Sequence, residues 1–247
     1  MSEFSVKLIL TDIEGTTTSI SFVKEVLFPY AKVHSKAYLE ETWDSDETQH
    51  IVRDIKSCLP QYKEFFRVGN EEPNVSAGVI ASFVNFLIDK DLKVGPLKNL
   101  QGLVWEKGYM SGKIKGHIYA DVLPAFKRWH EAGIPIAIYS SGSVKAQKLL
   151  FGQTIYGDLL PYISGHYDTA VGHKQQKQSY ENIAKDLNLP SEDVLFLTDV
   201  VKEAEAAREA GMQVVLLARP GNAPLTDDDK IAFTFVENFD NLKINLK

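Results

Sequence analysis

The sequence lacks the features that mark secreted, membrane-spanning and nucleic-acid-binding proteins. It has one cysteine, Cys58, so no disulfide can form within the chain. No apolar run approaches the roughly 20 residues that a helix needs to cross a bilayer. Residues 1–10 lead into a strand-like run without the apolar region of a signal peptide. The net charge of −6 comes from mixed signs, so no basic stripe is available for nucleic acid. We therefore expect an intracellular protein.

The composition is that of an ordinary globular protein. Of the 247 residues, 44% are apolar and 24% are charged, which allows a sizeable core and does not indicate disorder. Neither repeats nor low-complexity segments are present. The length fits one large domain, or a core with a smaller inserted unit.

Short apolar runs alternate with helical patterns over the second half of the chain. The runs occupy residues 134–139, 194–197 and 214–217, and a fourth run at residues 8–10 precedes Asp12. Predicted helices cover residues 144–151, 179–187 and 201–210. This alternation predicts an α/β fold with a parallel sheet and helices on both of its faces.

The segment 21–115 has a different pattern. Its apolar residues recur at helical spacing in four successive stretches, and no strand-like run interrupts them. We predict an all-helical insertion here, with residues 113–116 as the hinge through which the chain returns to the sheet. Residues 1–20 and 116–247 would then form the α/β core.

Two acids, Asp12 and Glu14, follow the first predicted strand. A carboxylate can attack phosphorus and form an acyl phosphate, which divides one difficult displacement into two easier steps. A second acid just beyond the strand can protonate the leaving oxygen and later activate water. Gly15 allows the sharp backbone path that this requires. For these two residues alone, a pair of acids that merely caps a loop is an equally good interpretation.

Three further polar residues follow predicted strands or precede predicted helices: Ser140, Lys174 and Asp199. The carboxyl ends of parallel strands meet in one crevice, so we expect these residues to join Asp12. Asp199 would be costly to bury without a partner, and Mg²⁺ prefers a few carboxylates together with water and phosphate oxygens. Ser140 would bind a phosphate at a helix N-terminus, and Lys174 would neutralise its charge.

These residues also have plainer interpretations. Ser140 would be part of a helix cap, for which Ser143 is the better candidate. Lys174 taken alone is typical of a surface lysine. Glu203 lies one helical turn beyond Asp199, and we expect it to be a solvated acid on a helix face rather than a group that orients metal-bound water.

Residues 12–16, Ser140, Lys174 and Asp199 resemble, in order and context, the motifs of the haloacid dehalogenase superfamily. The sequence is more similar still to the enolase-phosphatase (acireductone synthase) branch, because Glu14 stands where most superfamily phosphatases carry aspartate. Three longer strings also resemble that branch, at residues 20–30, 139–152 and 218–224. The resemblance covers nearly the whole chain. It implies a Rossmann-like haloacid dehalogenase core with a helical cap inserted after the first strand.

The resemblance implies a reaction in methionine salvage. The substrate would be 2,3-diketo-5-methylthiopentyl-1-phosphate, which is first enolised and then dephosphorylated to 1,2-dihydroxy-3-keto-5-methylthiopentene. Asp12, Glu14 and Asp199 would hold one Mg²⁺ per subunit, Glu14 either through its side chain or only through its backbone carbonyl. The family further implies a monomer in the cytoplasm, and also in the nucleus, that acts on a small phosphorylated diketone and binds neither nucleic acid nor membrane.

The same resemblance assigns roles to the site residues. Ser140, Ser141 and Lys174 would bind the substrate. Asp12 would also be the nucleophile, and Lys174 would act on the transferring phosphate. Glu14 is the first candidate for the base that removes the carbon-bound proton.

Other functions stay open at this point. One is a general magnesium-dependent sugar-phosphate phosphatase of the same superfamily, and another is a binding protein that retains the fold without catalysis. The intact set of site residues speaks against the binding protein. A dehalogenase needs no metal and no second acid such as Glu14. Dinucleotide binding is disfavoured because no Gly-x-Gly-x-x-Gly string follows a predicted strand.

Overall fold

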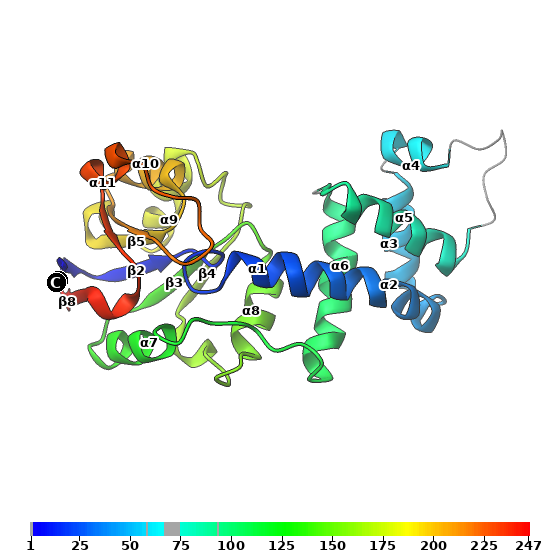
Figure 1. The fold of residues 1–247 in the computed structure, drawn as a ribbon, viewed down its shortest axis with the longest axis horizontal. Coiled ribbons are helices and arrows are strands. Elements are labelled where there is room, and N and C mark those ends of the chain that lie inside the picture. Colours follow the sequence, from blue (N-terminus) through cyan, green and yellow to red (C-terminus); the bar gives the residue numbers. More distant parts are fainter. Residues whose placement is uncertain (1, 58, 67–74, 93) are drawn as a thin grey trace. The chain divides into compact units, whose positions relative to one another are not determined.

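The computed structural model describes residues 2–57, 59–66, 75–92 and 94–247, and Cys58 lies outside these ranges. The chain divides into two compact units, both drawn in Figure 1. Met1–Phe22 and Lys115–Lys247 form one, here called the core unit, and Val23–Ile114 form the other, here called the helical unit. Within the described ranges, no helix is both long enough and apolar enough to cross a bilayer.

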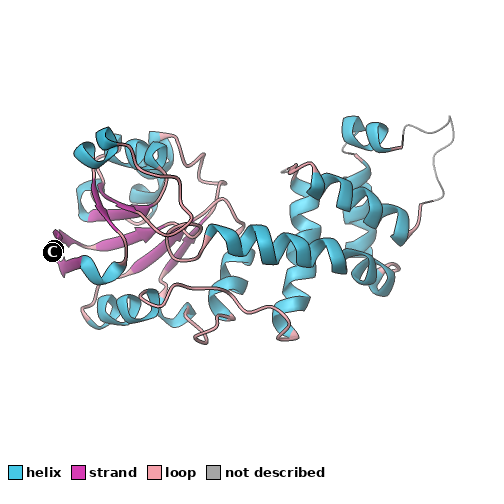
Figure 2. Cartoon of the chain, viewed as in Figure 1, coloured by secondary structure: helices cyan, strands magenta, loops and turns pink. Residues whose placement is uncertain are grey.

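The core unit is built on a six-stranded parallel sheet with the strand order β4-β3-β2-β5-β6-β7. The strands are β2 (Leu8–Thr11), β3 (Ile136–Tyr139), β4 (Gly165–Tyr167), β5 (Val194–Thr198), β6 (Gln213–Leu217) and β7 (Thr234–Val236). Figure 2 draws the strands as magenta arrows among cyan helices. The predicted α/β class and parallel sheet are confirmed. The outer strands β4 and β7 flank the four strands that the sequence indicated.

Helices cover both faces of this sheet. The helices of the core unit are α1 (Ile20–Phe22), α7 (Val122–Glu131), α8 (Val144–Gly152), α9 (Lys177–Asp186), α10 (Val201–Glu209) and α11 (Asp227–Ala232), and all but the short α1 lie beside the sheet. Apolar residues of α9 and α10, among them Tyr180 and Ala207, pack with Leu10 and Phe196 of the sheet. Figure 1 shows α7 and α8 on the opposite side. Because both faces are covered, every residue of β2, β3 and β5 is buried, which explains their nearly continuous apolar runs.

The register of the sheet brings the ends of its central strands to one edge. Thr11, the last residue of β2, lies beside Leu197 of β5, and β3 runs parallel on the other side of β2. The residues that follow these three strands are Asp12, Ser140 and Asp199. They therefore leave the sheet at the edge where α/β proteins commonly bind ligands.

A second, two-stranded parallel sheet pairs β1 (Ser2–Val6) with β8 (Leu242–Leu246). The carboxylate of Asp193, just before β5, forms ion pairs with Lys7 at 2.8 Å and with Lys247 at 2.5 Å. Its side chain is only 3% exposed. These contacts tie the small sheet to the start of a central strand of the large one.

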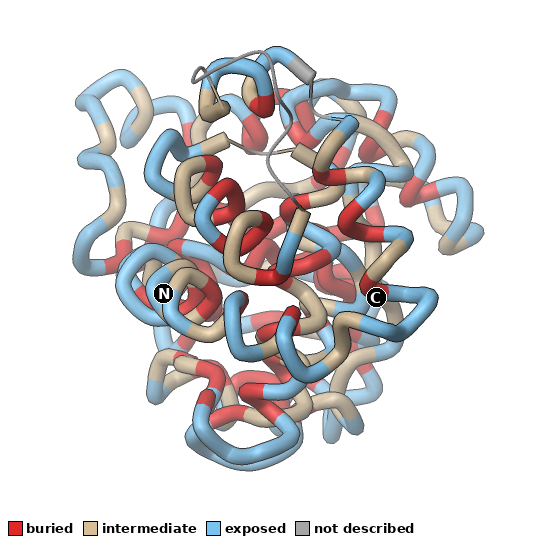
Figure 3. Tube along the Cα trace, turned by 90° about the vertical axis from the view of Figure 1, so that its right-hand side faces the viewer, coloured by how far each residue is buried: buried red, intermediate tan, exposed pale blue. Residues whose placement is uncertain are grey.

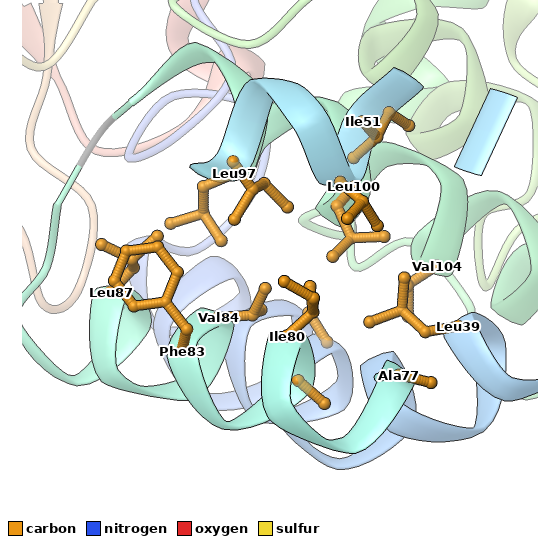
Figure 4. Close-up of a cluster of buried hydrophobic side chains, with 14 of the residues drawn as sticks. Leu39, Ile51, Ala77, Ile80, Phe83, Val84, Leu87, Leu97, Leu100 and Val104 are labelled. Carbon is orange, nitrogen blue, oxygen red and sulfur yellow. The ribbon is translucent and has the colours of Figure 1, made fainter. Parts of the chain in front are cut away.

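All regular structure described in the helical unit is helical, as the sequence predicts. A π-helical turn (Val23–Leu27) leads into α2 (Phe28–Thr42), α3 (Asp46–Lys56), α4 (Leu59–Phe65), α5 (Ala77–Asp89) and α6 (Gly95–Met110). The hydroxyls of Ser45 and Ser76 cap α3 and α5. The apolar faces meet in one core, which includes the buried Ile80, Phe83 and Leu100 (Figure 4). Figure 3 shows buried and exposed stretches alternating along the chain, as amphipathic elements require.

Phe83 is fully buried in this core, and its ring makes an edge-to-face contact with Tyr62 at a centroid distance of 5.1 Å. We expect Phe83→Ala to lower the free energy of unfolding by about 3–5 kcal/mol, because the lost ring leaves a cavity. Val33→Ala on α2, where the side chain is 71% exposed, should change it by less than about 0.5 kcal/mol. Urea unfolding followed by circular dichroism measures both variants, and equal effects would contradict the packing.

Candidate active site

Asp12 and Ser140 are almost fully buried where they leave the sheet, with 5% and 6% of their surfaces exposed. The backbone N–H of Asp12 donates to the carbonyl of Leu197 in β5 at 2.9 Å, which fixes the start of the loop after β2. Asp199, which follows β5, is half-buried. The topology of the sheet thus places residues from distant parts of the sequence at one edge.

Lys174 brings a buried ammonium group to the first of these acids. Its Nζ lies 2.6 Å from Oδ1 of Asp12 and 2.7 Å from Oε2 of Glu203. The hydroxyl of Tyr180 in α9 donates to the backbone carbonyl of Lys174 at 2.6 Å and holds its loop. Burial alone would lower the pKa of Lys174, but the carboxylates of Asp12 and Glu203 raise it above its ordinary value. Lys174 is therefore a protonated interior group, and its interpretation as a surface lysine is wrong.

The prediction that Glu203 is a solvated helix-face acid is also wrong. Only 8% of the residue is exposed, and besides binding Lys174 its Oε2 accepts a hydrogen bond from Oγ1 of Thr198 at 3.1 Å. Burial, and then the Asp12 carboxylate, raise the pKa of Glu203 against the pull of the Lys174 ammonium. Helical spacing could not show this, because the group that Glu203 faces lies on a separate loop.

Asp199 lies against the backbone of the loop that follows Asp12. Gly15 in that loop has φ +70°, a left-handed conformation that favours glycine. A Cβ atom at this position would overlap the Asp199 carboxyl group, whose most distant atom, Oδ1, would be only 2.8 Å away. The same Oδ1 is buried and has no hydrogen-bond partner among the described residues. Burial, followed by the charge of Asp12, raises the pKa of Asp199 to about 7.

The charges of this cluster favour a bound cation. When ionised, Asp12, Asp199 and Glu203 carry three negative charges, and Lys174 supplies a single positive one. The buried, unpartnered oxygen of Asp199 is a group that a metal ion would satisfy. Carboxylate oxygens are also the protein ligands that Mg²⁺ prefers, with water and phosphate oxygens completing its coordination. The residues present therefore fit Mg²⁺, and Asp12 and Asp199 are the candidate carboxylate ligands.

Glu14 lies on the loop after Asp12 and is exposed. Across the described ranges, no three His, Cys, Asp or Glu side chains are close enough together to hold one metal ion. Ligation by the Glu14 side chain next to Asp12 and Asp199 thus stays a prediction, and the backbone carbonyl of Glu14 is the alternative ligand.

The N-terminus of α8 is less open to an anion than the sequence suggests. The hydroxyl of Ser143 accepts from the N–H of Ala146 at 3.3 Å, so Ser143 is the N-cap. The N–H of Val144 donates to Oδ2 of Asp168 at 3.2 Å. Two N–H groups of the first turn are therefore already bonded within the protein.

Phosphate contacts on this side would come from the serines just before the cap. The hydroxyl of Ser140 accepts from the N–H of Gly142 at 3.3 Å, and Ser141 is exposed. The Nζ of Lys174 lies 5.7 Å from the ring centroid of Tyr139, the residue before Ser140. The ammonium of Lys174 and the loop of residues 140–143 therefore lie at the same part of the sheet edge.

Two further residues at this edge, Arg219 and Asn222, are not predicted from the sequence; both follow β6. Their side chains donate to backbone carbonyls of the loop after Asp12, those of Thr16 and Gly15. No spacing or charge pattern points to these two residues. The string 218–224 was notable only for its resemblance to the family.

Comparison with known proteins assigns the family. A model of haloacid dehalogenase-like hydrolases matches residues 6–211. The chain belongs to this family. A protein of Drosophila mojavensis named Enolase-phosphatase E1 is 57% identical over 97% of this hydrolase and 96% of its own length. The Drosophila melanogaster protein of the same name is 52% identical over 100% of this hydrolase and 96% of its own length. The resemblance to the enolase-phosphatase branch is confirmed.

Solved structures share the fold of this hydrolase. The UTR4 protein of Saccharomyces cerevisiae matches the hydrolase with a TM-score of 0.78 and 36% identity, over 96% of this chain and 100% of that chain. CbbY of Rhodobacter sphaeroides, solved with xylulose-(1,5)bisphosphate, has a TM-score of 0.55 and 17% identity over 97% of each chain. At that identity the likeness concerns the fold alone.

The raised pKa of Asp199, about 7, predicts how metal affinity depends on pH. Mg²⁺ binds the ionised carboxylate, so below the pKa it must displace a proton. We expect the affinity of the hydrolase for Mg²⁺ to be about tenfold weaker at pH 6 than at pH 8. Calorimetric titration with Mg²⁺ measures this, and an Asp199→Asn variant should lose most of the dependence. Equal wild-type affinities at the two pH values would contradict it.

Proposed function

We propose that this hydrolase is a magnesium-dependent enolase-phosphatase (acireductone synthase) of methionine salvage. It converts 2,3-diketo-5-methylthiopentyl-1-phosphate to 1,2-dihydroxy-3-keto-5-methylthiopentene and phosphate. The observation that carries the proposal is the buried ammonium of Lys174 against Asp12, which sets a phosphate-neutralising cation beside an acid able to attack phosphorus. The name shared by relatives at 52–57% identity supports an enolase activity beside the phosphatase activity.

Phosphate release begins at Asp12. Lys174 holds Oδ1 of Asp12, so Oδ2 attacks phosphorus while the bond from phosphorus to the substrate oxygen breaks. Glu14 gives its proton to the leaving oxygen, then takes a proton from the water that hydrolyses the acyl phosphate and restores Asp12. Asp12, Asp199 and a group of Glu14 would hold Mg²⁺, which would neutralise charge on the transferring phosphoryl group.

Enolisation comes before phosphate release in this scheme. A base takes the proton from the carbon between the phosphate oxygen and the neighbouring carbonyl. The electron pair of that C–H bond forms the new C=C bond. The carbonyl oxygen takes a proton from solvent, to which the base returns one at the end of the cycle. Glu14 is the first candidate for the base, because it is an exposed acid on the loop that carries Asp12.

The helical unit is proposed to act as a cap that closes over the substrate. Excluding water would strengthen the electrostatic interactions in the site, and the apolar methylthio group would contact the cap. We propose a monomer that takes a small phosphorylated diketone. Its placement in the cytoplasm, and also in the nucleus, stays a prediction from the resemblance.

One assay tests the function directly: purified protein with Mg²⁺ and the diketone phosphate. We expect enol absorbance to appear first and free phosphate to follow. Phosphate release from many sugar phosphates without an enol signal would instead identify a general phosphatase. Absence of turnover with every substrate at high Mg²⁺ would identify a binding protein.

Asp12→Asn tests the nucleophile. The amide keeps the size of the side chain but cannot form the acyl phosphate, so we expect phosphate release to fall by at least about a thousandfold. Circular dichroism should show an intact fold. Substantial activity in the folded variant would exclude Asp12 as the nucleophile.

Lys174→Ala tests the buried cation. Loss of the ammonium should reduce kcat/KM for phosphate release by about a hundredfold or more, because the transition-state charge on phosphorus is no longer neutralised. Lys177→Ala is the control, since Lys177 pairs with Glu181 on the surface of α9. A folded Lys174→Ala variant with the kinetics of the control would remove Lys174 from the site.

A further inference from the structure

The loop that carries Asp12, residues 12–18, is folded tightly on itself. Here it is called the nucleophile loop. The N–H groups of residues 16, 17 and 18 all donate to the carbonyl of Ile13, at 2.9–3.2 Å, and the N–H of Gly15 donates to Thr18 at 2.8 Å. The carbonyls of Gly15 and Thr16 take no part in these bonds and are bound from outside the loop.

Two side chains from the segment after β6 bind these carbonyls. Nδ2 of Asn222 donates to Gly15 at 2.8 Å and to Leu217 at 3.0 Å, which links the loop to the end of β6. Nε of Arg219 donates to Thr16 at 3.1 Å. Two consecutive peptide groups of the nucleophile loop are thus each held by a side chain about 200 residues away in sequence.

Arg219 is itself held in one orientation. Its terminal nitrogens bind the two carboxylate oxygens of Asp121 at 2.8 Å each. Its guanidinium lies 4.3 Å from the ring centroid of Tyr119 and 4.9 Å from that of Phe239. Asp121 is fixed in turn by the N–H of Phe239 at 2.7 Å. A planar group with a bidentate partner and stacked rings cannot rotate freely, so its Nε is aimed at Thr16.

We propose that Arg219 and Asn222 are positioning residues that set the distance between Asp12 and Asp199. Neither touches the substrate in this scheme; both act through the peptide groups of Gly15 and Thr16. The backbone of Gly15 lies against the Asp199 carboxylate, so a shift of the loop moves the two acids relative to each other. This inference rests on the proposed function, because these acids are the proposed Mg²⁺ ligands. Residues that orient metal ligands from outside commonly change metal affinity about 10–100-fold when they are replaced.

Asn222→Ala tests the proposal without leaving a buried charge. We expect the dissociation constant for Mg²⁺ alone, measured by calorimetry, to rise about tenfold. The Mg²⁺ concentration that half-saturates phosphate release should rise equally, while kcat at saturating Mg²⁺ returns to within about twofold of wild type. Gln213→Ala is the matched control, because Nε2 of Gln213 also donates to two carbonyls, those of Ser5 and Glu192.

Arg219→Lys keeps the positive charge beside Asp121 but loses the bond from Nε and the stacked plane. It should shift Mg²⁺ affinity in the same direction. Arg208→Lys is its control, since Arg208 donates to the carbonyl of Ala232 at 3.1 Å and lies 4.1 Å from the ring centroid of Phe233. If Arg219→Lys does not fold, Asn222→Ala decides the question alone.

The possible results distinguish failure of the positioning role from failure of the proposed function. A wild-type protein that binds Mg²⁺ and releases phosphate, with a folded Asn222→Ala variant of unchanged Mg²⁺ affinity, overturns the positioning role only. A variant that loses thermal stability but keeps its Mg²⁺ constants overturns it as well. A wild-type protein that neither binds Mg²⁺ nor releases phosphate overturns the proposed function, and the inference with it.

Discussion

One ammonium group, buried between two carboxylates, is the interaction on which the rest of the site depends. Lys174 can leave water only because Asp12 and Glu203 lie within 2.7 Å of its Nζ. Removing the ammonium would leave two buried carboxylates without their common partner, and loss of a partner is strongly destabilising in buried ion pairs. The contact that makes burial of the ammonium possible also holds a cation where the proposed phosphate transfer would need one. A positive charge at residue 174 is therefore needed both for the stability of the fold and for the proposed reaction.

The ammonium does not balance the cluster completely. Asp199 brings a third acid, and the rise of its pKa to about 7 reflects the cost of ionising it in a buried place near Asp12. A folded chain in this state gains by binding a cation, because ligands that bind the native state alone stabilise it. The proposed Mg²⁺ would thus contribute to the fold of the sheet edge as well as to the reaction.

The sequence predicts features that depend on the burial pattern of a single helix or strand. It does not predict contacts between side chains of one element and groups on another. Continuous apolar runs revealed four strands, whereas β4 and β7 have three residues each and are partly exposed. That Asp12 and Lys174 lie together could be predicted, because strand ends gather at one edge of a parallel sheet. The burial of Glu203 on α10 could not be predicted, because its partner Lys174 lies on a separate loop. Arg219 and Asn222 bind backbone carbonyls, which leave no trace in the local sequence.

Gly15 has a consequence for how closely two acids from different strands can approach. Metal–ligand distances in proteins hold to within about 0.2 Å, whereas carbon atoms rest in contact at roughly 3.5 Å or more. A Cβ at position 15 would stand at most 2.8 Å from every atom of the Asp199 carboxyl group. Any side chain there would displace that group by several times the distance that the proposed Mg²⁺ would tolerate. The backbone of Gly15, without a side chain, therefore fills the space between the ends of β2 and β5. That space cannot hold one further carbon atom.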